Sequence, residues 1–230
     1  MDSQSSHKVI AIDGPGGSGK STLAQNLAQA LGWVCLDTGA IYRVVALVLT
    51  QKGLVSAGEK VAGEVARNLN LTFEKVGFKH RLFLDGQDPG ETIRTPEITT
   101  LASKVSALPE VRTALLPLQR SLGQAGELIA EGRDMGTVVF PQAGLKFFLE
   151  ASPEIRAKRR FLELTQKGEN VTYSEVLARL KARDQADATR SLAPLTKAPG
   201  AVVLDSSCLT ASEVFEVAKD KAIKTFNLSL

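Results

Sequence analysis

Short apolar runs alternate with segments of helical periodicity over most of the chain. Residues 9–13 and 34–36 are apolar runs that predict buried strands. Leucines recur at helical spacing over 20–31, with Gly32 behind them as a C-cap, and a second helix is predicted over 38–52. A strand, a helix, a strand and a helix in this order predict a βαβ unit and a parallel sheet.

The same alternation returns in the C-terminal half. Apolar runs at 128–130, 146–149 and 201–204 predict three more strands. Pro153 begins an arginine-rich helix, and a Thr-x-x-Glu capping box at Thr172 begins the next one. Five apolar strands separated by helices predict an α/β fold, with a doubly wound parallel five-stranded sheet of the P-loop NTPase type.

The middle of the chain has a different pattern. Segments 71–76 and 81–84 are rich in β-forming residues on either side of Gly77, which predicts a β-hairpin. We expect residues 65–104 to form an antiparallel insertion outside the main sheet. Residues 1–64 and 105–230 would then form the core.

The composition is that of an ordinary globular protein. Of 230 residues, 43% are hydrophobic and 23% are charged, which excludes a disordered or collagen-like chain. The net charge of +3 is too small for a general nucleic-acid coat protein, so we predict no nucleic-acid partner. Because the sequence has no sustained heptad or long apolar stripe, we expect a monomer.

The N-terminus and the apolar runs give no sign of export or of a membrane anchor. The segment MDSQSSHK has no apolar core of signal-peptide length, and the longest apolar stretch, 44–49, is far shorter than the ~20 residues that span a bilayer. Cys35 and Cys208 lie far apart and have no His or Cys neighbour at metal-binding spacing. We expect two free thiols, no membrane association and a cytoplasmic location.

A glycine-rich loop follows the first predicted strand. Residues 14–21, GPGGSGKS, fit the G-x-x-x-x-G-K-[ST] pattern between a strand and a helix. Glycines allow successive backbone N–H groups to converge on phosphate oxygens, and the helix dipole adds to the attraction. Lys20 would reach the β- and γ-phosphates of a nucleotide, and the Ser21 hydroxyl would bind Mg²⁺.

The same loop also fits a dinucleotide fingerprint. Gly14, Gly16 and Gly19 have the G-x-G-x-x-G spacing, and Asp37 lies where a ribose-binding acid belongs in an NAD site. An NAD-dependent oxidoreductase is therefore one alternative, although this fingerprint gives no role to Lys20. A non-catalytic protein switched by a nucleotide is another. A GTPase is disfavoured because the chain has no Asn-Lys-x-Asp run.

Arginines gather after the predicted strands and on one predicted helix. Arg43 follows the second strand and Arg133-Asp134 follows the third, and in a doubly wound sheet these loops open on the same crevice as the glycine-rich loop. A further row at spacing i, i+4 and i+7 shares one helix face and consists of Arg183, Asp187 and Arg190. Such a row is also typical of a solvent-exposed salt-bridge ladder, and its spacing alone does not decide between the two interpretations.

Together these blocks resemble bacterial cytidylate kinases. The resemblance rests on the phosphate loop, LDTGAIYR, IRT, EGRDMGTVVFP, the RRxxEL-type stretch within 159–164 and ARDxxDxxR ending at Arg190. The blocks are collinear with that family over residues 9–205, and a mid-chain insertion is a feature of the family. The resemblance implies transfer of the γ-phosphoryl group of ATP to CMP or dCMP, giving CDP or dCDP, with the assistance of Mg²⁺.

The resemblance also implies roles for individual positions. The ATP site would consist of Gly14, Pro15, Gly16, Gly17, Ser18, Gly19, Lys20, Ser21 and Thr22, with Ser21 as the metal ligand. The monophosphate nucleotide would contact Thr38 (often Ser in the family), Arg43, Arg94, Ser103, Arg112, Arg133, Asp134, Arg183, Asp187 and Arg190. Phosphoryl transfer itself would be assisted by Lys20, Arg43, Arg133, Arg159 and Arg190. The insertion would bind the monophosphate, and an arginine-rich lid around 153–170 would close over ATP.

The implied reaction needs positive charge more than it needs a proton acceptor. ATP with a charge of about −4 meets an acceptor phosphate of about −2, and a single Mg²⁺ cannot neutralise both. The acceptor phosphate has a second pKa of about 6, so it is largely deprotonated at pH 7. We therefore predict in-line transfer with arginine charge neutralisation and no general base.

Overall fold

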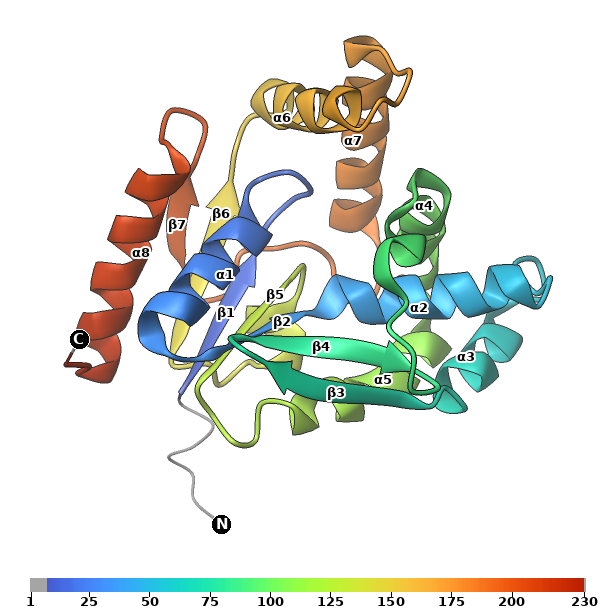
Figure 1. Cartoon of the computed structure of the whole chain (residues 1–230), viewed down its shortest axis with the longest axis horizontal. Helices are drawn as coiled ribbons and strands as arrows, with labels where there is room; N and C mark the ends of the chain where they lie inside the picture. The colour runs from blue at the N-terminus through green and yellow to red at the C-terminus, as the bar shows by residue number, and fades with distance from the viewer. Residues whose placement is uncertain (1–7, 230) are drawn as a thin grey trace.

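Five parallel strands form the centre of the computed structural model, which describes residues 8–229 (Figure 1). Across the sheet they lie in the order β2 (Val34–Asp37), β5 (Leu128–Gly132), β1 (Val9–Asp13), β6 (Leu145–Glu150) and β7 (Val202–Asp205). The prediction of a parallel five-stranded core is confirmed. The N-terminal segment in which we looked for a leader lies, up to residue 7, outside the described residues.

The strand order separates two of the functional hypotheses. Because β5 lies between β1 and β2, the parallel strands stand in the order 2-3-1-4-5 when they are numbered along the chain. The dinucleotide-binding fold has the order 3-2-1-4-5-6, in which the first two strands are neighbours. The sheet therefore argues against the NAD-dependent alternative.

Side chains alternate between two apolar layers along β1. Ile10 and Ile12 belong to a buried cluster under α1 (Lys20–Leu31) and α8 (Ala211–Phe226). The neighbouring residues Val9 and Ala11 belong to a cluster on the opposite face of the sheet. The central strand is thus buried on both faces, which explains its continuous apolar run.

The hairpin in the middle of the chain extends the main sheet instead of lying outside it. Strands β3 (Leu71–Val76) and β4 (Lys79–Leu84) pair with each other in antiparallel fashion, and β4 also pairs with β2 at Cys35 and Lys79. The Cys35 N–H donates to the Phe78 carbonyl oxygen at 2.9 Å. Our expectation of a separate insertion was wrong on this point, because the free edge of β2 is completed by the hairpin. The sheet has seven strands.

A second apolar cluster lies beyond the edge of the parallel strands. It joins α2 (Thr38–Gln51) to α3 (Glu59–Arg67), β4, the turn Gly90–Arg94, α4 (Pro96–Val105) and α5 (Pro109–Ser121). The sequence pattern did not indicate α3, which contains a glycine at position 63. A Cβ there would come within 2.5 Å of the Glu110 Cβ, so this glycine permits α3 and α5 to approach closely. The division into 1–64 with 105–230 and 65–104 stays a prediction.

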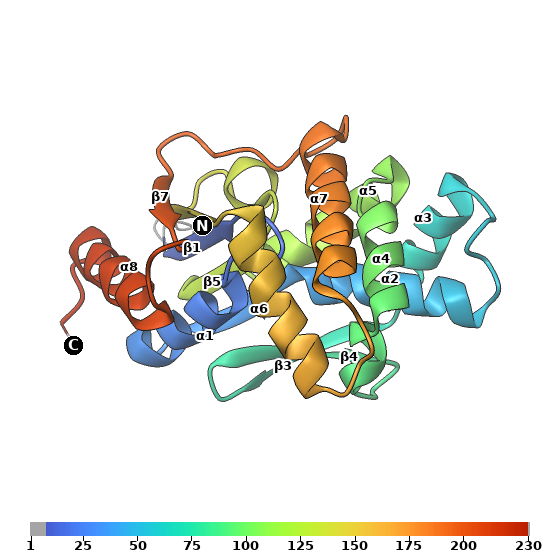
Figure 2. The same cartoon turned by 90° about the horizontal axis from the view of Figure 1, so that it is seen from above.

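Two long helices stand beyond the carboxyl ends of the parallel strands. Helix α6 (Pro153–Gln166) and helix α7 (Tyr173–Thr189) start with the predicted caps at Ser152 and Thr172 and pack together through a small buried cluster. Figure 2 shows α7 beside α4, as does Figure 1. Within residues 8–229, no helix combines the length and the apolar composition that a membrane crossing requires.

Candidate active site

The loop between β1 and α1 is tightly folded. A Cβ at Gly14 would come within 2.0 Å of the Leu149 carbonyl oxygen on β6, so only glycine fits there. Gly19 precedes α1 in the left-handed region, with φ of 98°. Among the described residues no side chain caps the start of α1. The first N–H groups of this helix are therefore available to an anion.

Lys20 is buried at the start of α1, with 5% of its surface exposed. Its ammonium group donates to the Pro15 carbonyl oxygen at 2.7 Å. Burial, and next the charge of Arg133, lowers the pKa of Lys20 to about 7. A bound phosphate group would offset both effects, so this position favours an anionic ligand.

Glu131, the fourth residue of β5, connects the loop to the start of α2. Its Oε1 accepts a hydrogen bond from the Ser21 hydroxyl at 2.5 Å, and its carbonyl oxygen accepts one from the Thr38 hydroxyl at 2.8 Å. Burial and the neighbouring Asp37 raise the pKa of Glu131. Two predicted site residues, one for each substrate, are thus held by a residue to which the sequence analysis gave no role.

Asp13, the last residue of β1, fixes the loop that follows β5. Its carboxylate accepts hydrogen bonds from the N–H groups of Met135, at 2.7 Å, and Gly136, at 2.8 Å. Burial raises the pKa of Asp13 to about 6 even though these hydrogen bonds oppose the shift. The π-helical turn Met135–Val139 begins here, so Asp13 sets the position of the preceding Arg133-Asp134 pair.

We expect the substitution Asp13→Asn to change stability in a pH-dependent way. The raised pKa means that the folded state holds a proton more tightly than the unfolded chain, so ionisation of Asp13 costs folding free energy as pH rises from about 4 to 6. A shift of about two pKa units corresponds to about 3 kcal/mol. The variant does not ionise at this position. Urea unfolding measures the free energy of unfolding of both proteins. The value for the variant minus the value for the original chain should increase by about 2–3 kcal/mol between pH 4 and pH 7.5. A difference that stays constant over this range would contradict the prediction.

Asp187 lies at the centre of the predicted acceptor side. Its Oδ2 accepts a hydrogen bond from Arg133 Nε at 2.8 Å and lies 4.0 Å from Arg183 Nε, and its Oδ1 accepts one from the Ser103 hydroxyl at 3.4 Å. Burial tends to raise the pKa of Asp187, but Arg133 and Arg183 outweigh it, and the pKa is lowered. With only 3% of Asp187 exposed, the interpretation of this row as a solvent-exposed ladder is wrong.

For the acceptor nucleotides that the sequence resemblance implies, CMP and dCMP, the substitution Asp187→Ala should raise the KM by about tenfold, because Arg133 and Ser103 lose the carboxylate that holds them and a charged hydrogen bond is worth about 1.5–3 kcal/mol. Glu163→Ala is a suitable control, since it breaks an exposed ion pair with Arg160 at 3.0 Å. Steady-state kinetics with CMP and dCMP measures both variants. An unchanged KM for both nucleotides would show that Asp187 has only a structural role.

A second buried pair joins α5 to the loop after β5. Arg112 forms an ion pair with Asp134, and both residues are less than 10% exposed. The Arg190 Nη2 lies 3.8 Å from the Asp134 Oδ1, and the Arg112 guanidinium lies 5.8 Å from the centroid of the Tyr42 ring. These contacts place three of the predicted acceptor residues in one group.

Several arginine N–H groups of the site have no hydrogen-bond acceptor among the described residues. These buried groups are Arg43 Nε, Arg183 Nε and Arg190 Nη2. Burial, followed by the charge of Arg133, lowers the pKa of Arg183 to about 10. Buried donors without partners are costly. The crevice therefore suits a ligand that carries many oxygen acceptors, as a phosphate does.

Two predicted site residues do not join this group in the described structure. Arg94 is largely exposed and contacts Glu91, at 3.6 Å. Arg159 donates to Ser206 on the other side of the phosphate loop, at 3.0 Å to its hydroxyl and 2.6 Å to its carbonyl oxygen. The Ser206 hydroxyl in turn donates to the Ser18 carbonyl oxygen at 3.0 Å, so Arg159 supports the loop from the β7 side.

Known proteins resemble this chain over nearly its whole length. The family model described as cytidylate kinase matches residues 10–224. The chain is 47% identical over 208 residues to the cytidylate kinase of Syntrophotalea carbinolica, covering 90% of this chain and 88% of the relative. It is also 47% identical over 209 residues to that of Geobacter sp. strain M21, covering 91% and 90%. The chain belongs to the cytidylate kinase family.

Membership of the cytidylate kinase family confirms the predicted enzyme, which transfers a phosphoryl group from ATP to CMP. Neither the NAD-dependent alternative nor the non-catalytic one finds support in these matches. Among solved structures, a gluconokinase from Sinorhizobium meliloti aligns over 95% of this chain and 93% of its own, with 15% identity and a TM-score of 0.46. That likeness is too distant to bear on the fold or the function.

Sequence reasoning gave no role to three charged residues that contact the candidate site, Asp13, Glu131 and Asp184, whereas Arg156 lies in the arginine-rich lid that we expected around 153–170. The first two follow apolar strand residues and so carried a usable signal, since polar residues at the carboxyl ends of parallel strands face the crevice. The helical spacing around Asp184 gave no comparable signal, because its partner is on another helix.

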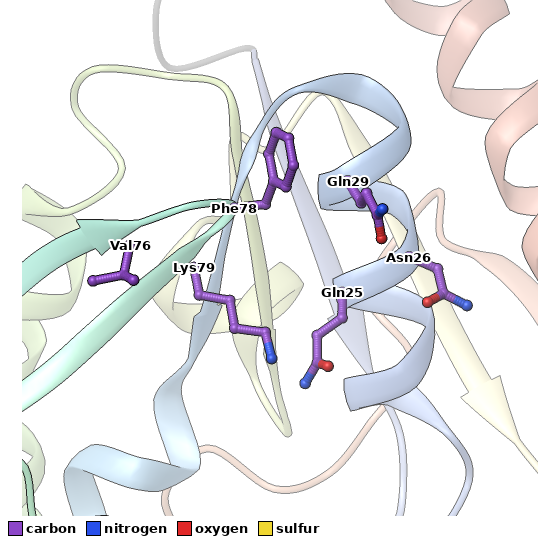
Figure 3. Close-up of a pocket in the computed structure, with 6 residues that line it drawn as sticks. All are labelled: Gln25, Asn26, Gln29, Val76, Phe78 and Lys79. Carbon is purple, nitrogen blue, oxygen red and sulfur yellow. The ribbon is translucent and has the colours of Figure 1, made fainter.

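A pocket elsewhere on the kinase is lined by none of the predicted site residues. It has a volume of about 240 Å³ and lies between α1 and the β3–β4 hairpin (Figure 3). Its walls are formed by Gln25, Asn26, Gln29, Val76, Phe78 and Lys79. Amide side chains of α1 thus face the turn of the hairpin on the side of the molecule where β4 meets β2.

Proposed function

We propose that this enzyme phosphorylates both CMP and dCMP with ATP and Mg²⁺, giving CDP or dCDP and ADP, at the site between the phosphate loop and α7. The observation that carries the proposal is the concentration of buried positive charge around Lys20. Arg133 and Arg183 both act on its pKa, and three arginines of the site have donor groups without an acceptor within residues 8–229.

The donor side would consist of the phosphate loop, Gly14–Thr22, and the start of α1. Backbone N–H groups of the loop would bind the β- and γ-phosphates, and Lys20 would leave its contact with Pro15 to reach them. Arg159 would act indirectly, because its contacts with Ser206 hold the loop in place.

The acceptor side would divide into a phosphate part, a sugar part and a base part. Arg43, Arg133 and Arg190 would bind the acceptor phosphate, and Arg183 with Asp187 would hold the sugar. The base would meet Ser103, Arg112 and Asp134. The buried contacts of Asp187 and Asp134 with these arginines support this division.

The residues around Ser21 fit a magnesium ion. Mg²⁺ is commonly held by one or two protein oxygen ligands together with phosphates and water. The Ser21 hydroxyl and the Glu131 carboxylate lie together at the open start of α1, with Asp37 close enough to act on the pKa of Glu131. When bound, the ion would neutralise part of the charge of the phosphates. Within residues 8–229 no cluster of three or more acidic, His or Cys side chains could hold a metal alone.

Phosphoryl transfer would then depend on position and charge. An oxygen of the acceptor phosphate would form a bond to the γ-phosphorus of ATP as the bond to the β,γ-bridging oxygen breaks. Lys20 and Arg133 would neutralise the charge that develops, and no side chain would have to remove a proton. Helices α6 and α7, which lie beyond the carboxyl ends of the parallel strands (Figure 1), would exclude water.

We propose that the enzyme acts as a monomer in the cytoplasm, since the sequence has no sustained heptad or long apolar stripe that would favour an interface between copies.

A coupled ADP-release assay tests the proposal. We expect rapid turnover with CMP and dCMP, slower turnover with UMP, and background rates with AMP and shikimate. Omission of Mg²⁺ should abolish the turnover. Binding of ATP without any turnover that depends on an acceptor would instead favour a non-catalytic protein, and equal rates with and without Mg²⁺ would contradict the assignment of Ser21.

A further inference from the structure

We propose that Asp184 is a positioning residue that, through Arg156, makes the binding of ATP and the binding of CMP depend on each other. This inference rests on the proposed placement of the two substrates and goes beyond it. Arg156 lies in the segment 153–170 that we expected to close over ATP, and Asp184 was assigned to neither substrate.

Arg156 connects three parts of the chain. It lies in the first turns of α6 and is 3% exposed. Its Nη1 donates to the Gly16 carbonyl oxygen in the phosphate loop at 3.0 Å, and its Nε donates to the Ala151 carbonyl oxygen after β6 at 2.9 Å. Its Nη2 donates to the Asp184 Oδ2 on α7 at 2.6 Å. Each side of this guanidinium is thus fixed to a different element.

Asp187, three residues further along α7, makes a second connection of this kind between α7 and the phosphate loop. It holds Arg133, whose Nη2 lies 3.5 Å from the place where a Cβ on Gly16 would stand. Two carboxylates of one helix therefore hold two arginines that lie against the same glycine. The position of α7 relative to the phosphate loop is set by both pairs.

The chemistry of the Arg156–Asp184 pair suits a positional role. Arg156 is buried and the Asp184 side chain is 22% exposed, and a largely buried ion pair of this kind is seldom a good source of stability, because desolvation offsets the attraction between the charges. This pair also leaves the Asp184 Oδ1 buried without a hydrogen-bond partner among the described residues. An apolar contact between α6 and α7 would hold them together at a lower cost. What the pair adds is a fixed geometry between Gly16 and α7.

The consequence is a coupling between the two substrate sites. Phosphates bound to the loop would order Gly16, and through Arg156 and Asp184 they would fix the helix that presents Asp187 to the acceptor. By linkage, CMP bound against α7 would favour the loop conformation that binds ATP by the same factor. Couplings of this kind commonly change affinity by about 5- to 150-fold.

Calorimetric titration of CMP, with and without a non-hydrolysable ATP analogue and Mg²⁺, measures the coupling directly. For the unmodified chain we expect CMP to bind at least about fivefold more tightly when the analogue is present. Asp184→Ala should reduce this ratio to below about twofold. Asp184→Asn, which still offers Arg156 an acceptor oxygen, should keep part of the ratio, and titration of the analogue with and without CMP should give the same factors.

A matched control is available on the same two helices. Lys181 on α7 and Glu154 on α6 form an ion pair at 3.0 Å, but both side chains are more than half exposed and neither contacts the loop. Glu154→Ala should leave the ratio unchanged. A general loosening of the helix pair would lower the ratio in both variants and would overturn the proposal.

Other results would also overturn the proposal, and they can be told apart. A ratio in Asp184→Ala equal to that of the unmodified chain, or a ratio of one in the unmodified chain, would remove the coupling role while leaving the proposed function intact. Failure of the unmodified chain to bind either nucleotide would remove the proposed function as well. If Asp184→Ala does not fold by circular dichroism, Asp184→Asn carries the test. A ratio in Asp184→Asn below those of the unmodified chain and of Glu154→Ala would support the proposal, and a ratio equal to either of them would overturn it.

Discussion

The substitution Lys20→Met should lower kcat by about 10³-fold or more. Lys20 is the buried cation at the start of α1. Its position next to the phosphate loop allows it to stabilise the negative charge of the phosphoryl group during transfer. Methionine fills a similar volume without the charge. Steady-state kinetics at saturating ATP and CMP measures the loss.

Stability should not fall with this substitution. Burial lowers the pKa of Lys20 to about 7, which means that the charged form is disfavoured in the folded protein, so removal of the amine relieves the fold of that cost. Lys52→Met, at the exposed end of α2, is the matched control and should leave kcat unchanged. If Lys20→Met retains a tenth of the original kcat, the loop has been misinterpreted.

The substitution Asp134→Ala should lower kcat/KM for CMP by about 100-fold and should reduce the ratio of CMP to UMP by about tenfold or more. Cytosine carries an amino donor at C4 where uracil carries a carbonyl acceptor, and a carboxylate accepts from the first and repels the second. Asp134 is the buried carboxylate of the acceptor group, beside Arg112 and Arg190.

A purely structural role for Asp134 predicts a different result. If this carboxylate serves only to hold Arg112, both substrates should lose the same factor and the ratio should not move. Parallel kinetics with CMP and UMP, on a variant whose fold is checked by circular dichroism, distinguishes the two. Asp88→Ala breaks an exposed ion pair with Arg81 in the hairpin region and serves as a control for nonspecific loss.

The parallel strands could be predicted from the sequence because each contains a short apolar run, which is continuous in β1 and β5, the strands buried on both faces. The attachment of the β3–β4 hairpin to the main sheet could not be predicted from the sequence. It depends on pairing between Cys35 and Lys79, two residues far apart in the chain, and no local pattern encodes that contact. Helix α3 was missed because Gly63 weakens the helical signal. A glycine is needed there because α5 packs closely against α3, and the local sequence does not indicate that contact.

In the candidate site, too, features encoded by consecutive residues could be predicted, and features that depend on contacts between distant residues could not. The phosphate loop carries its chemistry in consecutive residues, so its motif was sufficient to find it. The spacing of Arg183, Asp187 and Arg190 left an exposed ladder as an alternative, because burial depends on which element packs against that helix face. Glu131 stood next to predicted residues but has meaning only through its contact with Ser21, 110 positions away.

The pairing of strand ends has an evolutionary consequence. Asp13 pairs with Gly132 and Asp37 pairs with Glu131, so the loops for donor and acceptor both depart from neighbouring, hydrogen-bonded backbone positions. Their separation is set by the sheet and does not depend on which base is bound. New acceptor specificities can therefore arise by exchange of side chains on α4, α5 and α7 and at Asp134 in the loop after β5, while the alignment needed for transfer is inherited unchanged. Directed evolution of this enzyme toward other monophosphates should accordingly accumulate substitutions at these positions and spare the paired strand residues Asp13, Asp37, Glu131 and Gly132.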